Sequence, residues 1–294
     1  MNRPESNSAA TTPTIGVFDS GFGGLTVLRA LMARLPRARF CFLGDTARLP
    51  YGSKSRRTIA RYAAQSAQFL VREQGAEFLV IACNTASALA LDAIRDAVPV
   101  PVLGVIEPGA EAARAASRTG DVLVIATDAT VESHAYAAAC RARGLRALEK
   151  ACPLLVPLVE EGWTDHPVTA QVIRIYLDEL SAEAAAQGMN PDTLVLGCTH
   201  YPLLRPLMER AVPPGVRVID SAEATAEEAL RQFGRQDTGH DPPSHRASQS
   251  AKRLPPSAQD LRCFATDSVE KFERLGSRFL HRPVGNVELV DLGG

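Results

Sequence analysis

The sequence predicts an α/β protein that consists of two related domains, each with a parallel sheet. Apolar runs of strand length alternate with helical patterns throughout the first two hundred residues, and this alternation is typical of parallel sheets with helices on both faces. The length of 294 residues corresponds to two domains of ~150 residues. Strand ends of similar sequence also recur in the same order along the chain.

The apolar pattern predicts the individual elements in chain order. A strand at 14–18 is followed by a helix in which Leu25, Leu28, Met32 and Leu35 recur at spacings of three and four. Further strands are expected at 40–43, 78–82, 102–105, 122–126, 194–196 and 216–219, and a long helix at 58–74. Near the end of the chain, RCFAT at 262–266 predicts a strand, 268–279 a helix and 287–290 a short strand.

The recurring strand ends indicate an internal repeat. Thr127, at the end of VIAT, lies 108 positions after Asp19, at the end of GVFD. Cys198, at the end of LVLGC, lies 115 positions after Cys83, at the end of LVIAC. Between these ends, GDTARLPYG around Asp45 has a weaker counterpart in ACPLLVPLVEEG. The repeat predicts two related flavodoxin-like domains.

The predicted domain A comprises 15–105 plus 219–294, and the predicted domain B comprises 106–218. Residues 1–14 are polar and lack the apolar core of a secretory signal, so a flexible tail is expected there. Residues 234–260 are rich in Pro, Ser, Gln and Arg, which predicts a flexible loop without a catalytic role. Ligands of open parallel sheets bind beyond the carboxyl ends of the strands, so the active site is expected in the cleft between the domains.

Composition excludes several classes of function. A formal charge of -1 provides no field to attract nucleic acid, and no apolar run approaches the ~20 residues that cross a bilayer. A small-molecule partner and a cytoplasmic location are therefore expected. The six cysteines form no C-x-x-C pair, and a reducing compartment argues against disulfides.

Cys83 and Cys198 are the leading candidates for chemistry, because each stands where an apolar strand gives way to a helix. The helix dipole at such a position is expected to lower the thiol pKa. Either thiol alone could be a small core residue. A zinc site with His200 would need further soft ligands at short spacing, and a redox dithiol normally lies within one turn. Two thiols at equivalent positions of related domains favour two proton-transfer groups.

The run Asp19-Ser20-Gly21-Phe22-Gly23-Gly24 follows the first strand and opens a helix. It is not a dinucleotide-binding G-x-G-x-x-G motif, because Thr26 stands where the third glycine belongs. Two interpretations remain open. The backbone N–H groups could hold a ligand carboxylate, or Asp19 and Ser20 could cap the helix.

Six motifs in order resemble those of the glutamate racemases, cofactor-independent enzymes that supply D-glutamate for peptidoglycan. They are DSGFGGLTV, GDTARLPYG, ACNTASA, VPLVEEG, GCTHYPLL and IDSAEATA. The resemblance covers 15–231 continuously and 264–292 more faintly. It implies that Cys83 takes the α-proton from D-glutamate and that Cys198 takes it from L-glutamate.

The resemblance also implies supporting roles for other residues. Asp19 assists the first thiol, His200 stands beside the second, and Glu160 supports that histidine. Asp45 is expected to organise the site without reacting. The substrate contacts implied by the motifs are Ser20, Pro50, Tyr51, Gly52, Asn84, Thr85, Thr127, Thr130 and Thr199. No metal or other cofactor is expected, and a homodimer is the expected assembly.

Alternatives stay open for function and for single residues. An aspartate or hydantoin racemase of the same fold, or a binding or regulatory relative without turnover, would share most of these features. Without the resemblance, the adjacent carboxylates of Glu160 and Glu161 would indicate a solvent-exposed face of the protein. Asn84, Thr85 and Thr199 could equally be residues that cap helices. The chain departs from the family pattern in its long loop near 242–256 and in His281, which stands where a glycine often closes the last helix.

Overall fold

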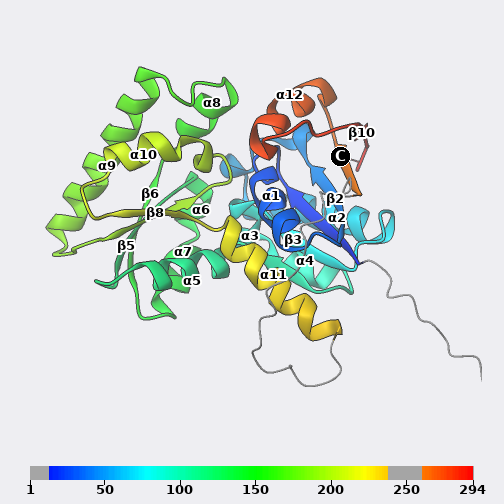
Figure 1. Cartoon of the computed structure of the whole chain (residues 1–294), viewed down its shortest axis with the longest axis horizontal. Helices are drawn as coiled ribbons and strands as arrows, with labels where there is room; N and C mark the ends of the chain where they lie inside the picture. The colour runs from blue at the N-terminus through cyan, green and yellow to red at the C-terminus, as the bar shows by residue number, and fades with distance from the viewer. Residues whose placement is uncertain (1–12, 238–259, 294) are drawn as a thin grey trace, which may run out of the picture.

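The computed structural model, which describes residues 13–237 and 260–293, contains two parallel sheets (Figure 1). The first sheet has the order β10-β9-β2-β1-β3-β4 and the second has the order β6-β5-β7-β8. Every neighbouring pair of strands runs parallel. The strands are β1 (Thr14–Asp19), β2 (Arg39–Gly44), β3 (Phe78–Ile81), β4 (Val102–Gly104), β5 (Asp121–Ala126), β6 (Arg146–Ala151), β7 (Thr193–Gly197), β8 (Arg217–Asp220), β9 (Leu261–Ala265) and β10 (Val287–Leu289).

Helices cover both faces of each sheet, because successive strand residues point to opposite sides and both sides are apolar. Val17 packs with one core cluster and Phe18 with another. In the first domain, α1 (Leu25–Arg34), α11 (Ala222–Asp237) and α12 (Val269–Leu280) lie on one face, and α2 (Arg56–Arg72), α3 (Asn84–Leu89) and α4 (Leu91–Ala97) on the other. In the second, α5 (Ile106–Ala116) and α7 (Ala135–Arg141) oppose α8 (Leu155–Glu160), α9 (Pro167–Ala186) and α10 (Arg205–Ala211). The short helices are α6 (Asp128–Glu132), η1 (Thr46–Arg48), η2 (Tyr51–Ser53) and η3 (Tyr201–Leu204).

The order β2-β1-β3-β4 in the first sheet matches β6-β5-β7-β8 in the second. The predicted fold class, two related α/β domains with parallel sheets, is therefore confirmed. The sequence did not predict β6, which has the sequence RALEKA and in which one of six residues is buried. It forms the edge of its sheet, where polar side chains reach water, so it lacks the apolar run that identified the other strands.

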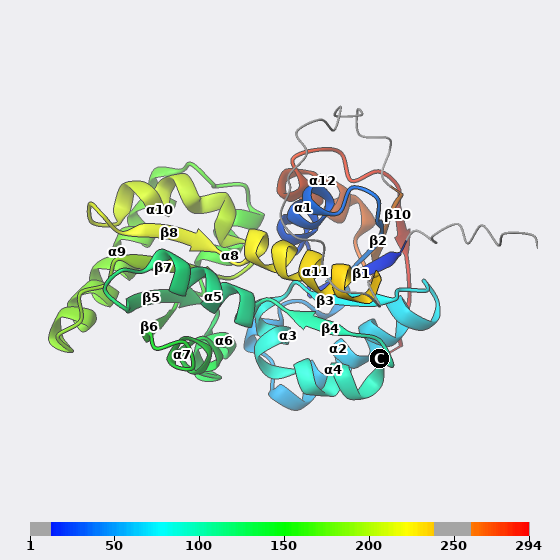
Figure 2. The same ribbon diagram turned by 60° about the horizontal axis from the view of Figure 1, so that its bottom comes forward.

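The chain passes between the domains twice, from β4 into α5 and from β8 into α11. The helix α11 packs against α1 of the first domain and α5 of the second, and Figure 2 shows it running across the junction. Ile219 and Asp220 pair with β7, so the boundary predicted after residue 218 falls inside β8.

The expected tail and loop differ from the structure at their edges. Thr14 already belongs to β1, and α11 continues to Asp237, which corrects the expectation that the loop begins at 234. The remainder of these two segments, 1–12 and 238–259, lies outside the described residues.

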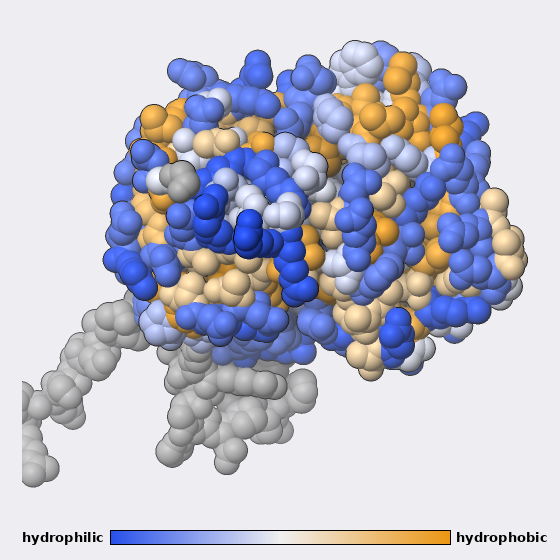
Figure 3. All heavy atoms as spheres, turned by 180° about the vertical axis from the view of Figure 1, so that it is seen from behind, coloured by the Kyte–Doolittle hydropathy of each residue, from blue (hydrophilic) through white to orange (hydrophobic). Residues whose placement is uncertain are grey.

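None of the helices in the described part of the chain combines the length and the hydropathy that a membrane span requires. The face in Figure 3 is largely hydrophilic, with hydrophobic side chains in smaller groups between the polar ones. Leu154, Trp163, Val168 and Ile175 are exposed apolar side chains that lie in or beside α8 and α9.

His281 ends α12 in the left-handed conformation, with φ 57° and ψ 25°. This conformation costs a residue with a Cβ about 1–2 kcal/mol, and glycine adopts it freely. The backbone conformation at position 281, where the family pattern often has a glycine, is therefore one that favours glycine.

We predict that His281→Gly raises the free energy of unfolding by about 1 kcal/mol, because relief of the left-handed strain exceeds the added backbone entropy of the unfolded chain. The melting temperature, measured by circular dichroism, should rise by roughly 2–4 °C. His281→Ala removes the same imidazole and keeps the Cβ, so it should show no such gain. Equal melting temperatures for the two variants would contradict the argument.

Candidate active site

Both predicted cysteines line one cavity of ≈ 450 Å³, which opens at the carboxyl ends of strands from both domains. Most of the other predicted site residues line it as well: Ser20, Pro50, Tyr51, Gly52, Asn84, Thr85, Thr127, Glu160, Thr199 and His200. Asp19 and Thr130 are buried and do not line it. The strand-end repeat therefore places one thiol from each domain at a common space.

Cys83 caps the N-terminus of α3. Its Sγ accepts a hydrogen bond from the Ala86 backbone N–H at 3.4 Å and donates to Ser20 Oγ at 3.4 Å. Burial, followed by the Asp19 carboxylate, raises the pKa of the Cys83 thiol to about 12. The expectation that its position on a helix lowers this pKa is wrong, because two N–H contacts and a hydroxyl do not offset burial next to a carboxylate.

The glycine-rich turn after β1 holds the carboxyl group of Asp19. Asp19 Oδ2 accepts a hydrogen bond from the Gly21 N–H at 2.9 Å, and the N–H groups of Gly24 and Ser20 also face the carboxylate. Within the described residues Oδ1 is buried without a hydrogen-bond partner. Burial raises the pKa of Asp19, and His200 and the N–H groups only partly offset this effect. The N–H groups of the turn are thus directed at a carboxyl of their own chain.

Cys198 lies beside a series of charged side chains. Its Sγ is 4.0 Å from His200 Nδ1. On the other side of the imidazole, His200 Nε2 is 3.4 Å from Glu160 Oε1. This second distance is that of an ion pair, but the contact does not have the geometry of a hydrogen bond. The other oxygen of Glu160 lies 3.1 Å from Lys271 Nζ. A positive imidazolium at His200 would therefore lie between a thiol and a carboxylate.

The pKa values of His200 and Glu160 favour the charged forms of these two side chains. Burial lowers the pKa of His200, but its contacts with Cys198 and Glu160 raise it more, to about 10. Burial raises the pKa of Glu160, but His200 and Lys271 outweigh it, so that the net pKa is lowered. The surroundings of the two thiols are hence opposite in charge: a carboxylate beside Cys83 and an imidazolium beside Cys198.

The glycine-rich turn also brings the domains into contact. A Cβ on Gly23 would lie 2.2 Å from Thr199 Oγ1 and 2.8 Å from His200 Nδ1. A Cβ on Gly24 would lie 2.5 Å from the Cβ of Asp19. Because real Cβ atoms do not approach so closely, glycine at position 23 allows the turn of the first domain to reach the end of β7 in the second, and glycine at position 24 allows the turn to close on its own strand.

Three threonine hydroxyls join the domains on another side of the cavity. Thr85 Oγ1 lies 3.0 Å from Thr127 Oγ1 and 3.2 Å from Thr130 Oγ1, and the latter two are 2.9 Å apart. Thr130 is fully buried, and its hydroxyl contacts the other two from the side away from the cavity. Thr85 and Thr127 present their hydroxyl groups to the cavity.

Asp45 anchors the loop that carries Pro50, Tyr51 and Gly52. It accepts a hydrogen bond from the Tyr51 hydroxyl at 2.5 Å and from Thr266 Oγ1 at 3.0 Å. Burial raises the pKa of Asp45, and these hydrogen bonds lower it in part. A Cβ on Gly52 would lie 3.1 Å from Thr127 Cβ, so the loop closely approaches the second domain.

Several residues that line the cavity are not among the predicted site residues, including Lys271, Asp128, Phe22, Ser268 and Val156. Lys271 matters most, because within the described residues no other lysine or arginine lines this cavity. It comes from α12, where the sequence indicates an amphipathic helix but no motif, so no local signal pointed to the site. In the described ranges no group of three or more His, Cys, Asp or Glu could hold a metal ion.

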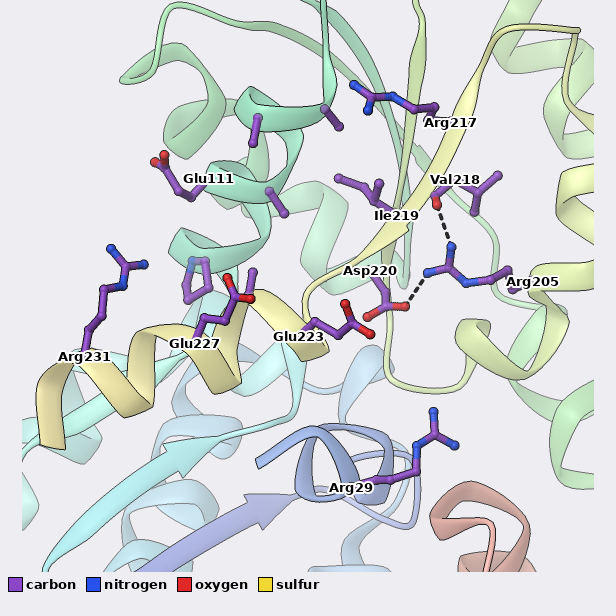
Figure 4. Close-up of a pocket in the computed structure, with 15 residues that line it drawn as sticks. Arg29, Glu111, Arg205, Arg217, Val218, Ile219, Asp220, Glu223, Glu227 and Arg231 are labelled. Atoms are coloured by element: carbon purple, nitrogen blue, oxygen red, sulfur yellow. Dashed lines mark hydrogen bonds and ion pairs between the residues drawn. The ribbon is translucent and has the colours of Figure 1, made fainter. Parts of the chain in front are cut away.

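A second cavity, of ≈ 620 Å³, lies between α1, α5, α11 and β8 (Figure 4). Its rim carries acidic side chains of α11 and several arginines, and Arg205 binds Asp220 at 2.5 Å and the Val218 carbonyl at 2.6 Å. None of the predicted site residues lines this cavity. The thiols and the titratable series belong to the smaller one.

Comparisons with known proteins agree with this arrangement. The chain is 55% identical over 295 residues to the glutamate racemase of Koribacter versatilis (strain Ellin345), covering 96% of this chain and 98% of the relative. A glutamate racemase of Francisella tularensis subsp. tularensis SCHU S4 in complex with D-glutamate superposes with a TM-score of 0.80 at 33% identity, covering 96% and 98% of the two chains. The glutamate racemase of Thermus thermophilus in complex with β-chloro-D-alanine superposes with a TM-score of 0.76 at 41% identity, covering 96% of this chain and 97% of that chain.

The family model described as Asp/Glu/Hydantoin racemase matches residues 25–229, from the start of α1 into α11. The match includes the ends of β3 and β7, where the two thiols stand. With this match and the near full-length relatives, the chain belongs to the Asp/Glu/hydantoin racemase family.

Proposed function

We propose that this chain is a glutamate racemase that interconverts L-glutamate and D-glutamate by a cofactor-independent mechanism with two cysteines. One observation carries the proposal: thiols at equivalent strand ends of two related domains line a single cavity. Inversion of an α-carbon removes a proton from one face and delivers another to the opposite face. Two proton-transfer groups on opposing domains meet that requirement.

The opposite surroundings of the thiols suggest which of them acts as the base in the resting form that accepts L-glutamate. Cys83, whose pKa is raised to about 12, is the thiol that gives a proton, and Cys198, 4.0 Å from His200 Nδ1, is the base. For L-glutamate, Cys198 takes the α-proton and the carbanion then takes the proton of Cys83 on the other face. The enzyme is left with a Cys198 thiol and a Cys83 thiolate, which is the form that accepts D-glutamate.

Supporting residues return the enzyme to its resting form. The imidazolium of His200 stabilises a thiolate at Cys198, and Glu160 with Lys271 keeps that imidazole charged. Asp19, with its raised pKa, can hold a proton and pass it to the Cys83 thiolate after turnover, while the Cys198 thiol gives its proton to water. The hydroxyls of the cavity and the amide of Asn84 supply donors for substrate carboxylates, and a site closed to water strengthens these interactions.

The cellular part of the proposal rests on the family. The named relatives are glutamate racemases, and the corresponding role here is to supply D-glutamate for peptidoglycan and thereby maintain the cell wall and cell shape. We infer a cytoplasmic enzyme that acts as a homodimer.

The substrate is tested by circular dichroism with purified protein. L-Glutamate should lose its signal without any added cofactor, with kcat/KM about 100-fold above that for L-aspartate, because one methylene changes the fit of both carboxylates. Faster turnover of aspartate or of a hydantoin would instead assign one of the related activities. Binding of glutamate without turnover would indicate a relative that only binds.

The two thiols are tested with glutamate analogues that carry a leaving group at the β-carbon, since elimination needs proton removal but no reprotonation. Cys83→Ala should eliminate from the L-analogue through Cys198, and Cys198→Ala from the D-analogue through Cys83. Both variants should lose racemisation in both directions. One variant that processes both enantiomers, or reversed preferences, would refute the assignment of the two thiols.

The charge on His200 makes stability depend on pH. Its pKa is raised from an unfolded value near 6.5 to about 10, so the stabilisation is fully present below about pH 6.5 and is lost as pH rises towards 10. Urea unfolding across this window should show a larger loss for the wild type than for His200→Gln. Parallel curves for wild type and His200→Gln would mean that His200 is neutral in the fold.

A further inference from the structure

The hydroxyl group of Tyr136 reaches across the domain junction to a residue of the candidate site. Tyr136 belongs to α7 of the second domain and is fully buried. Its hydroxyl donates a hydrogen bond to Oδ1 of Asn84, in α3 of the first domain, at 2.7 Å. Asn84 lines the cavity with the two cysteines.

This hydrogen bond determines which way the Asn84 amide faces. A tyrosine hydroxyl has one proton, and here Oδ1 of the amide accepts it. The N–H₂ group lies on the other side of the same amide, so its donors are directed away from Tyr136. They are available to an acceptor in the cavity, such as a carboxylate.

The same hydroxyl is held by the second crossover between the domains. The side chain of Ser221, between β8 and α11, lies beside the Tyr136 hydroxyl and faces it. Since the tyrosine proton goes to Asn84, the Tyr136 oxygen is left as an acceptor on the side of Ser221. Asp220, next to Ser221, is tied to Arg205, which holds the crossover in place (Figure 4).

The first crossover leads into α5, which also contacts Tyr136. A Cβ on Gly109 in α5 would lie 3.0 Å from the Tyr136 hydroxyl, and a Cβ on Gly197 would lie 3.0 Å from the ring. Two glycines thus make room for the ring and its hydroxyl. Both connections between the domains, and one residue of the cavity, meet at this single side chain.

We propose that Tyr136 is a positioning residue that orients the Asn84 amide towards a substrate carboxylate and ties it to both connections between the domains. This role rests on the proposed racemase function, because the group that accepts a hydrogen bond from the Asn84 N–H₂ is taken to be a carboxylate of the substrate. Tyr136 acts through Asn84 and does not line the cavity itself. Substrate binding and the relative placement of the domains are coupled at this residue.

The test is a double-mutant cycle with Tyr136→Phe and Asn84→Ala. Tyr136→Phe keeps the ring and removes only the hydroxyl, so the protein should fold. In the wild-type background it should raise KM for glutamate roughly tenfold with kcat changed less than about threefold, because an unheld amide weakens substrate binding. In the Asn84→Ala background the same change should leave KM unaltered.

Tyr201→Phe is the matched control. Tyr201 is equally buried, but its hydroxyl donates to the carbonyls of Ala126 and Cys152 at 3.1 Å and 2.9 Å. It should lower the melting temperature about as much as Tyr136→Phe and leave KM within about twofold of the wild type. A rise in KM that is the same with and without Asn84, or no rise at all, would overturn the proposal.

The cycle also contains a measurement that does not depend on turnover. The free energies of unfolding of the four proteins should be non-additive, which reports the Tyr136–Asn84 contact in any case. If the wild type fails to racemise glutamate while unfolding is non-additive, the proposed function fails and the contact stands. Additive unfolding together with normal racemisation would remove the positioning role and leave the proposed function intact.

Discussion

The site depends on one close approach, that of the glycine-rich turn after β1 to the end of β7. At Gly23 any side chain would collide with Thr199 and His200, and at Gly24 it would collide with Asp19. The absence of a Cβ therefore lets each of two complete sheets present its strand ends to a common space. The threonine hydroxyls and the Tyr51 loop then add contacts around the same space, but they do so between domains that the turn has already brought together.

The two halves of the cavity carry opposite charge, although the sheets behind them have the same strand order. On one side a buried carboxyl is held by N–H groups of its own turn, and on the other an imidazole bridges a thiol and a carboxylate. The repeat accounts for the positions of the thiols. The differences arise from side chains just beyond the strands and from α12, which has no counterpart in the second sheet.

Much of this architecture could be predicted because buried parallel strands are apolar throughout, and their polar ends stand out in the sequence. The edge strand β6 could not be predicted in this way, because its polar side chains reach water and it therefore has no continuous apolar run. Lys271 could not be placed either, because it meets Glu160 only through the packing of α12, far along the chain. The predicted lowering of the Cys83 pKa is wrong for a related reason: a helix terminus is visible in sequence, but the depth of burial and the direction of the Asp19 carboxyl are not.

Thermodynamics limits the effect that the unequal surroundings of the two thiols can have on the reaction. Enantiomers have equal free energies in water, and both directions of a racemisation share one transition state, so kcat/KM must be the same for the two substrates. The imidazolium beside Cys198 and the carboxylate beside Cys83 cannot bias the product ratio away from one. They can only set which protonation form of the free enzyme predominates, and hence divide a fixed kcat/KM differently between kcat and KM for each enantiomer.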